Sequence, residues 1–128
     1  MNSLLDAAHV NAIRGSARIE NNEYGNLISW SQRGAVASST YSDASIENYG
    51  AIVGEAGAGS LVWGAEDATL TNYGTIRATN DIAHTDTDFL FFGAQVWSKT
   101  AGDATLTNKS GGEIIAHDGW AAWVLSTD

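Results

Sequence analysis

The strongest constraint on the fold is a short stretch of sequence that recurs along the chain. Residues 68–76 read Ala-Thr-Leu-Thr-Asn-Tyr-Gly-Thr-Ile, residues 44–52 and 104–108 copy all or part of them, and residues 17–28 form a looser copy. Recurrence at roughly 24 to 28 residues indicates one supersecondary unit per repeat, stacked on its neighbours so that all share a continuous core. The sequence therefore predicts a repeat protein.

The pattern within one repeat predicts strands. Leu70 stands between Thr69 and Thr71, which is the period-two alternation of a half-buried strand. The Asn-Tyr-Gly that follows predicts a turn in which Gly74 takes a positive φ, and Gly50 holds the same place in the upstream copy. About three short strands per unit and no helix predict an all-β fold, a parallel β-helix (solenoid) of about four to five coils.

A second regularity supports the stacking. An apolar strand ends near each of four valines, and these are Val36, Val62, Val96 and Val124. We take these valines as equivalent positions on successive coils. The interval before Val96 is longer than the others, which predicts a loop inserted at residues 78–95.

The chain of 128 residues is predicted to form a single domain, with residues 14–128 as stacked coils. Residues 1–13 are an N-terminal cap or a first partial coil. Ser3, followed three residues later by Asp6, resembles a capping box and predicts a short helix before His9. The alternative is a strand over residues 10–15.

Composition excludes several classes of protein. Fifteen acidic side chains against six basic ones give a formal net charge of −9, which disfavours nucleic acid and anionic membrane surfaces as partners. No apolar run approaches the ~20 residues of a spanning helix, so we expect no membrane-embedded segment. Cysteine is absent, which excludes a disulfide framework. The first residues lack the pattern of a secretory signal, so an exported protein would have this chain as an excised part.

The recurring Ala-Thr-Leu-Thr-Asn-x-Gly-x-Ile pattern at residues 44–52 and 68–76 resembles the passenger domains of bacterial autotransporters. Related repeats occur in haemagglutinin-like secreted adhesins. The resemblance covers roughly residues 10–128, and it implies a right-handed β-helix that is secreted or displayed at the outer membrane on the cell surface. Many such proteins are virulence-associated adhesins, and the absence of cysteine agrees with export of an unfolded passenger. The Lys109-Ser110 departure from Tyr-Gly predicts a bulge in the last copy.

The resemblance implies that the chain is a scaffold and an adhesion or binding module, with a host surface protein or a glycan as partner. One alternative is a polysaccharide-processing lyase or hydrolase, because some such enzymes are β-helices and Asp81, Asp86, Asp88 and Glu55 supply carboxylates. No catalytic motif accompanies them, so the sequence favours a non-enzymatic role and identifies no catalytic residue. A second alternative is self-association along a polar face.

Two sets of polar residues recur with the repeat. Asn48, Asn72 and Asn108 hold equivalent positions, so their amides are predicted to form a structural ladder along the solenoid. A second set stacks in the same way, and it consists of Asp43, Asp67 and Asp103. We interpret these aspartates as acceptors for backbone N–H groups in Asx turns, with a calcium site as the weaker alternative.

The insertion carries the least repetitive chemistry. Asp81, His84, Asp86 and Asp88 lie close together there, and such side chains can bind divalent ions. Their spacing matches no EF-hand loop, so a solvated acidic loop is favoured and no metal or other cofactor is assigned.

Aromatic residues supply the other candidate binding groups. Trp63 and Trp97 follow equivalent valines, so alternation directs both side chains outward on neighbouring coils. Tyr49 and Tyr73 form a second predicted stack at the turns. The insertion ends in three more candidates, Phe89, Phe91 and Phe92. These aromatic side chains either offer an open face to a sugar ring or partner protein, or the phenylalanines fold back over the tryptophans and bury them.

Overall fold

The chain is an all-β parallel solenoid of about four turns, a parallel β-helix. The computed structural model describes residues 6–30, 32–55, 57–79, 91–117 and 119–127, apart from the side chain of Phe91, and these residues contain no helix. Every strand pairs in parallel with its counterpart one coil away. The predicted fold class and the number of coils are confirmed.

Three sheets form the sides of the solenoid. Sheet A contains β1 (Ala8–Ala12), β4 (Ala35–Ser39), β7 (Ser60–Gly64), β10 (Phe91–Ser98) and β13 (Gly119–Ser126). Sheet B contains β2 (Ala17–Asn21), β5 (Ala44–Asn48), β8 (Ala68–Asn72) and β11 (Ala104–Asn108). Sheet C contains β3 (Asn26–Ser29), β6 (Ala51–Gly54), β9 (Thr75–Ala78) and β12 (Glu113–Ala116).

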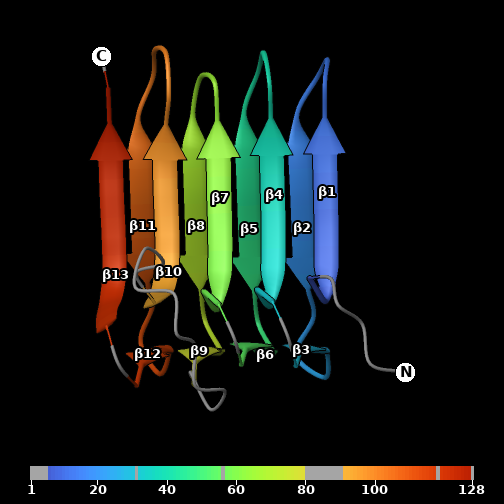
Figure 1. Ribbon diagram of the computed structural model, residues 1–128, viewed down its shortest axis with the longest axis vertical. Coiled ribbons are helices and arrows are strands. Elements are labelled where there is room, and N and C mark those ends of the chain that lie inside the picture. Colours follow the sequence, from blue (N-terminus) through green and yellow to red (C-terminus); the bar gives the residue numbers. More distant parts are fainter. Residues whose placement is uncertain (1–5, 31, 56, 80–90, 118, 128) are drawn as a thin grey trace.

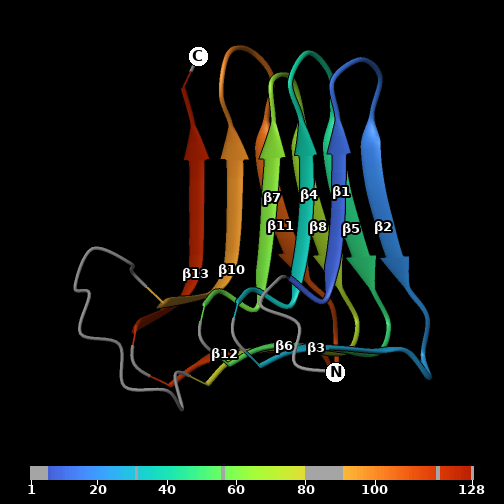
Figure 2. The ribbon, with the colours of Figure 1, turned by 45° about the vertical axis from the view of Figure 1, so that its right-hand side comes forward.

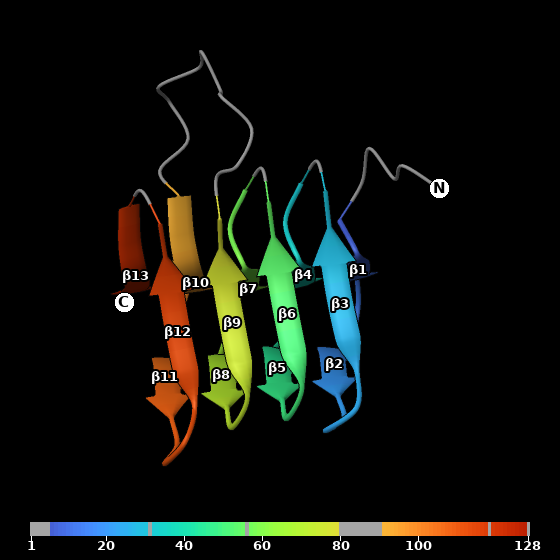
Figure 3. The same cartoon turned by 90° about the horizontal axis from the view of Figure 1, so that it is seen from below.

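Figure 1 shows sheet A in front of sheet B, with the strands of each sheet in coil order from β1 to β13. Figure 2 shows that sheet C closes the lower side of the space between them. Seen from below, β3, β6, β9 and β12 lie side by side (Figure 3). The three sheets therefore enclose the interior of the solenoid, into which alternate residues of the middle strands, such as Ala68, Leu70 and Asn72 of β8, are buried.

The repeated sequence aligns in register. Leu70 pairs with Ile46 on one side and Leu106 on the other, and Ile76 pairs with Ile52 and Ile114. The largest apolar side chains of the middle coils are fully buried, and these are Ile46, Ile52, Leu70, Ile76, Val62 and Val96. Apolar residues at equivalent positions, stacked at strand spacing, thus make one continuous core.

One valine was assigned to the wrong coil position. Val62, Val96 and Val124 are equivalent, as predicted, but Val62 pairs with Ala37 while Val36 pairs with Leu61. All five residues of β4 are buried, so burial on both faces erased the alternation that would have distinguished the inner residue from the outer one.

The first coil begins with a strand at Ala8. β1 spans Ala8–Ala12 and pairs with β4, so the strand alternative is confirmed with earlier bounds, and His9 and Val10 belong to the first coil. Residues 1–5, where most of the predicted helix falls, lie outside the described residues.

The insertion is shorter than predicted. Ala78 belongs to β9 and residues 91–95 belong to β10, because the pairing of Ala94 with Ser60 continues the solenoid. The sequence assigns Phe91 and Phe92 to the loop because no earlier repeat has a match for them. Residues 80–90 lie outside the described residues.

Asparagine side chains connect the corners between sheets B and C. The Nδ2 atom of Asn48 lies 2.8 Å from Oδ1 of Asn72, and Nδ2 of Asn72 lies 2.8 Å from Oδ1 of Asn108. Asn21 adds a fourth member, with its Nδ2 atom 2.8 Å from Oδ1 of Asn48. The same amides donate to backbone carbonyls of their own corner and of the next coil, as Asn72 does to those of Gly74 and Glu113. The ladder therefore satisfies the buried polar groups where strand pairing is interrupted.

The corner glycines are required for close packing, not for a positive φ. Gly50 and Gly74 lack the left-handed conformation that we predicted. A Cβ atom on Gly74 would lie 2.0 Å from the carbonyl oxygen of Gly50, and one on Gly50 would lie 2.2 Å from that of Gly25. Successive corners thus stack so closely that no side chain fits between them.

The last corner contains a turn where a bulge was predicted. Gly111 has a positive φ of 84°, and the backbone N–H of Gly112 donates to the carbonyl of Lys109 at 2.8 Å. The pairing of β11 and β12 with the preceding coil continues in register on both sides. The residues between Asn108 and Glu113 are thus accommodated within the corner, and neither strand contains a bulge.

We expect Asn72→Ala to lower the free energy of unfolding by about 2 to 5 kcal/mol, because it removes the acceptor of Asn48 and the donor to Asn108 inside the molecule. Urea unfolding followed by circular dichroism measures the change. Asn26→Ala, at an exposed position of β3, serves as the control and should have little effect. Equal stability of Asn72→Ala and the parent chain would contradict the structural role of the ladder.

Gly74→Ala should destabilise the fold by about 3 kcal/mol, because the methyl group would overlap the backbone of the preceding corner. Gly111→Ala is the matched control: its Cβ would meet nothing within 4 Å, and only the left-handed backbone opposes it, at about 1 kcal/mol. Urea unfolding of both variants gives the comparison. A larger loss for Gly111→Ala would refute the close-packing explanation.

Candidate binding face

A pair of tryptophans lies on the outward side of sheet A. Trp63 of β7 pairs in register with Trp97 of β10, and their ring centroids are 6.2 Å apart with a 49° tilt. Both follow buried valines, as predicted, so alternation directs them away from the core. The two half-buried side chains form a double indole surface that crosses two neighbouring coils.

Lys99 places a positive charge beside the tryptophan pair. Its Nζ atom lies 5.1 Å from the centroid of the Trp63 ring, within range of a cation–π interaction. The Nε1 atoms of Trp63 and Trp97 are buried and have no hydrogen-bond partner in the described part of the chain. The indoles therefore offer ring surface, while their N–H groups are shielded.

A second aromatic cluster lies across β10 and β13. The ring of Phe92 makes an edge contact with Trp120 at 5.9 Å between centroids and a tilted contact with Trp123 at 5.7 Å. Phe92 itself is buried, whereas Trp120 is 57% exposed. Because Trp123 pairs with Gln95, two residues before Trp97, the cluster shares sheet A with the tryptophan pair. We call Trp63, Trp97, Phe92, Trp120 and Trp123 the aromatic face.

Sequence reasoning identified only part of this face. Trp63, Trp97 and Phe92 were predicted, while Trp120, Trp123 and Lys99 were missed. Counting back from Val124 as from Val96 would have placed Trp123 opposite Gln95. Phe92 contacts Trp120 and Trp123, so the prediction that it covers Trp63 and Trp97 is replaced by a cluster one coil further on.

The other residues predicted in the insertion cannot be placed on this face. Asp81, His84, Asp86, Asp88 and Phe89 lie outside the described residues, as does the side chain of Phe91. Within the described ranges, no group of three or more His, Cys, Asp or Glu residues could hold a metal ion. The divalent-ion alternative for the insertion stays a prediction.

The stacked aspartates bind backbone across coils. Oδ1 of Asp43 accepts the N–H of Asp67 at 3.1 Å, and Oδ1 of Asp67 accepts the N–H of Asp103 at 2.9 Å. These carboxylates thus accept backbone N–H groups, but on the following coil and not in their own turn as the Asx-turn interpretation required. Neutralisation by N–H dipoles allows like charges to stand one strand spacing apart.

The predicted tyrosine stack is present at the corner between sheets B and C. The rings of Tyr49 and Tyr73 are 4.6 Å apart and nearly parallel, at 7°. The hydroxyl of Tyr49 donates to Oε1 of Glu47 at 2.6 Å. This hydrogen bond, with desolvation and the negative charge of Glu47, raises the pKa of Tyr49 to about 12.

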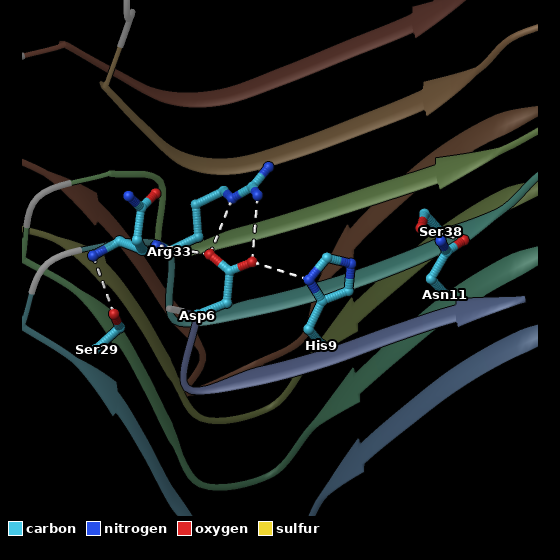
Figure 4. Close-up of polar contacts among 7 residues, drawn as sticks. Asp6, His9, Asn11, Ser29, Arg33 and Ser38 are labelled. Carbon is cyan, nitrogen blue, oxygen red and sulfur yellow. Dashed lines mark hydrogen bonds and ion pairs between the residues drawn. The ribbon is translucent and has the colours of Figure 1, made fainter. Parts of the chain in front are cut away.

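An ionic cluster at the start of the chain was not predicted. Asp6, whose side chain is 5% exposed, accepts hydrogen bonds from the backbone N–H and Nε of Arg33 at 3.1 Å, and its Oδ2 atom lies 3.1 Å from Nδ1 of His9 (Figure 4). The carboxylate joins the segment before β1 to the segment before β4, so its role is to anchor the first coil. Asp6 and Arg33 are 27 residues apart, and no sequence pattern indicates that they form an ion pair.

Comparison with protein-family models, with curated proteins and with solved structures gives no match to this chain. The described residues also contain no helix long and apolar enough to cross a membrane. The site must therefore be interpreted from its own geometry.

The Tyr49–Glu47 hydrogen bond leads to a pH prediction. Ionisation of Tyr49, followed by NMR of its ring carbons, should have its midpoint near pH 12, and Glu47→Gln should lower the midpoint toward 10.0. Because the pKa is raised in the folded state, the bond contributes its stability below about pH 10 and loses it as pH rises to about 12. Glu23→Gln, in a different corner, is the control and should leave the midpoint unchanged.

Proposed function

We propose that this chain is part of the passenger region of a secreted or surface-displayed autotransporter-like bacterial protein, in which it serves as a solenoid scaffold and a non-enzymatic adhesion module. The repeated Ala-Thr-Leu-Thr-Asn pattern and the cysteine-free composition support that class. The aromatic face supports the binding role. The observation that carries the proposal is the gathering of five aromatic side chains, from three neighbouring strands, on one sheet.

The composition of the aromatic face favours a glycan as the ligand. Aromatic rings present flat apolar surface to the C–H side of a sugar ring, and tryptophan contributes the largest such surface. Trp63 and Trp97 place this surface in register on two strands about 4.8 Å apart, and Trp123 continues it on the next strand, displaced by two residues, which suits an extended polymer that crosses the coils. The net charge of −9 disfavours acidic polysaccharides, so the proposed ligand is a neutral or weakly charged one.

Trp120 is the most exposed side chain of the aromatic face, so it is the ring that a ligand can contact most fully. It is more than half exposed, whereas Trp63, Trp97 and Trp123 are half-buried and Phe92 is buried beneath it. An exposed aromatic residue beside a packed aromatic base resembles the arrangement of energetic hot spots at interfaces. Trp120 is thus expected to contribute most to binding, with the other tryptophans extending the contact.

A glycan array with the 128-residue chain, followed by calorimetric titration of the strongest ligand, tests the proposal. Trp120→Ala should weaken binding roughly ten-fold or more, because it removes the most accessible ring of the face. Trp30→Ala is the matched control: Trp30 is 58% exposed, like Trp120, but follows β3 in sheet C. Binding should survive this change.

Three results would count against the proposal. One is the absence of any glycan ligand on the array. Another is an equal loss for Trp30→Ala and Trp120→Ala, which would indicate non-specific apolar contact. The third is cleavage of a bound polysaccharide, detected as new reducing ends, which would favour the enzymatic alternative.

A further inference from the structure

A cation lies beside the tryptophan pair, and no acidic side chain of the described residues neutralises it. Lys99 is exposed, and its Nζ atom lies 5.1 Å from the centroid of the Trp63 ring. None of the ion pairs among the described residues includes Lys99. An ammonium group has three N–H donors, so Lys99 retains the capacity to bind an acidic group from outside the chain.

Three acidic side chains lie in the neighbouring corners without pairing with Lys99. Glu66 and Asp67 follow β7, and Asp103 precedes β11. Oδ1 of Asp67 accepts the backbone N–H of Asp103 at 2.9 Å, so this carboxylate binds the next corner and not the lysine. The ammonium group therefore has the Trp63 ring as its neighbour and no carboxylate within ion-pair distance.

The backbone holds Lys99 in place beside the tryptophans. Its N–H donates to the carbonyl of Gly64 at 2.9 Å, and its own carbonyl accepts a hydrogen bond from the hydroxyl of Thr127. Lys99 directly follows β10 and stands two residues after Trp97, so alternation along the extended chain directs both side chains to the outward side of sheet A.

A polar side chain lies on the other side of Trp97. Gln95 precedes Trp97 by two residues, and both side chains are half-buried while Ala94 and Val96 face the core. Alternate residues of a strand are roughly 7 Å apart, so an amide, an indole and an ammonium group follow one another along the outward side. A sugar ring on the Trp97 indole would thus have an amide at one edge and a positive charge at the other, and such convergent polar groups fix the orientation of a ligand.

Charge selects among the sugars that could lie there. A polymer with many acidic groups would be repelled by the net charge of −9 of the whole chain. A single carboxylate in contact with Lys99 experiences less of this repulsion and accepts a charge-assisted hydrogen bond. An amino sugar would bring a second positive charge to the place that Lys99 occupies, and like charges in contact oppose binding.

From these observations we propose that the aromatic face binds a glycan whose contacting sugar carries one carboxylate, with the sugar ring on Trp97 and the carboxylate on Nζ of Lys99. Lys99 is the specificity-determining residue, and Gln95 orients the ring by hydrogen bonds to its hydroxyl groups. This inference rests on the proposed glycan-binding function. It narrows the ligand to one that carries a single negative charge at the contact.

Matched pairs of glycans on the array give the first test. The members of a pair differ only in whether the terminal sugar carries a carboxylate, as glucuronic acid differs from glucose. In the pairs that bind, we expect the carboxylated member to bind about five-fold more tightly, which is the effect of one exposed ion pair. Calorimetric titration of both members measures the ratio.

Substitutions of Lys99 separate its charge from its packing. Lys99→Gln should weaken binding of the carboxylated glycan about five-fold and leave binding of its neutral counterpart unchanged. Lys99→Arg keeps the positive charge and should bind both glycans like the parent chain. Lys109→Gln is the matched control, because it removes the same charge from an exposed position in the corner between β11 and β12, and it should change neither affinity.

The other outcomes overturn the inference in distinguishable ways. Equal binding of the two members of every pair would leave the proposed glycan binding intact and remove the acidic specificity. Equal losses for both glycans in Lys99→Gln would show that Lys99 only packs against Trp63, and a similar loss in Lys109→Gln would show an effect of net charge. A preference for amino sugars would show that the indoles bind a cation. Absence of any glycan ligand would overturn the proposed function as well.

Discussion

The buried row of asparagine amides is the interaction on which the rest of the solenoid depends. At each corner between sheets B and C the chain changes direction, and the asparagine side chain points into the molecule beneath the turn, where it meets backbone carbonyls of the corner. Asn48 and Asn72 donate to those carbonyls and also connect successive coils at 2.8 Å. An amide carries both a donor and an acceptor, so one residue type repeated in register can continue the row indefinitely. Leucine at the same place would make none of these bonds, and an ionised aspartate could accept but not donate.

The ladder also explains the glycine that follows each asparagine. Amides that contact one another bring successive corners to within strand spacing, and the carbonyl of Gly50 then occupies the place where a side chain of Gly74 would be. The sequence predicted the turn and the glycine correctly but for the wrong reason. Close approach between two coils is a property of the assembled solenoid, and a single repeat carries no sign of it.

Most of the fold could be predicted because the repeat encodes it locally. The alternation around Leu70 and the recurrence of Asn72 were sufficient for the strands, the coils and the ladder. The register of β4 was not predictable, because Ala37 inside and Val36 outside are both small, apolar and buried. The Asp6–Arg33 pair was not predicted, because its two residues lie outside the repeated pattern, on two neighbouring coils.

The same distinction applies to the candidate site. Trp63 and Trp97 were found because they belong to the repeat, whereas Trp120 and Trp123 belong to a strand that has no complete repeat after it. Sheets B and C carry the regular polar residues, while sheet A carries the aromatic face and so departs from the pattern. We therefore expect the regular sides to support the fold and the irregular side to bind.

Hydrogen exchange of the asparagine side-chain amides tests the central claim most directly. Because the ladder is buried and continuous, the Nδ2 protons of Asn48 and Asn72 should exchange only when the whole solenoid unfolds. Their protection should therefore match that of the most protected backbone amides of β5 and β8. Exchange of Asn72 as fast as that of exposed Asn26 would contradict the account, since it would show that the corners open independently of the sheets.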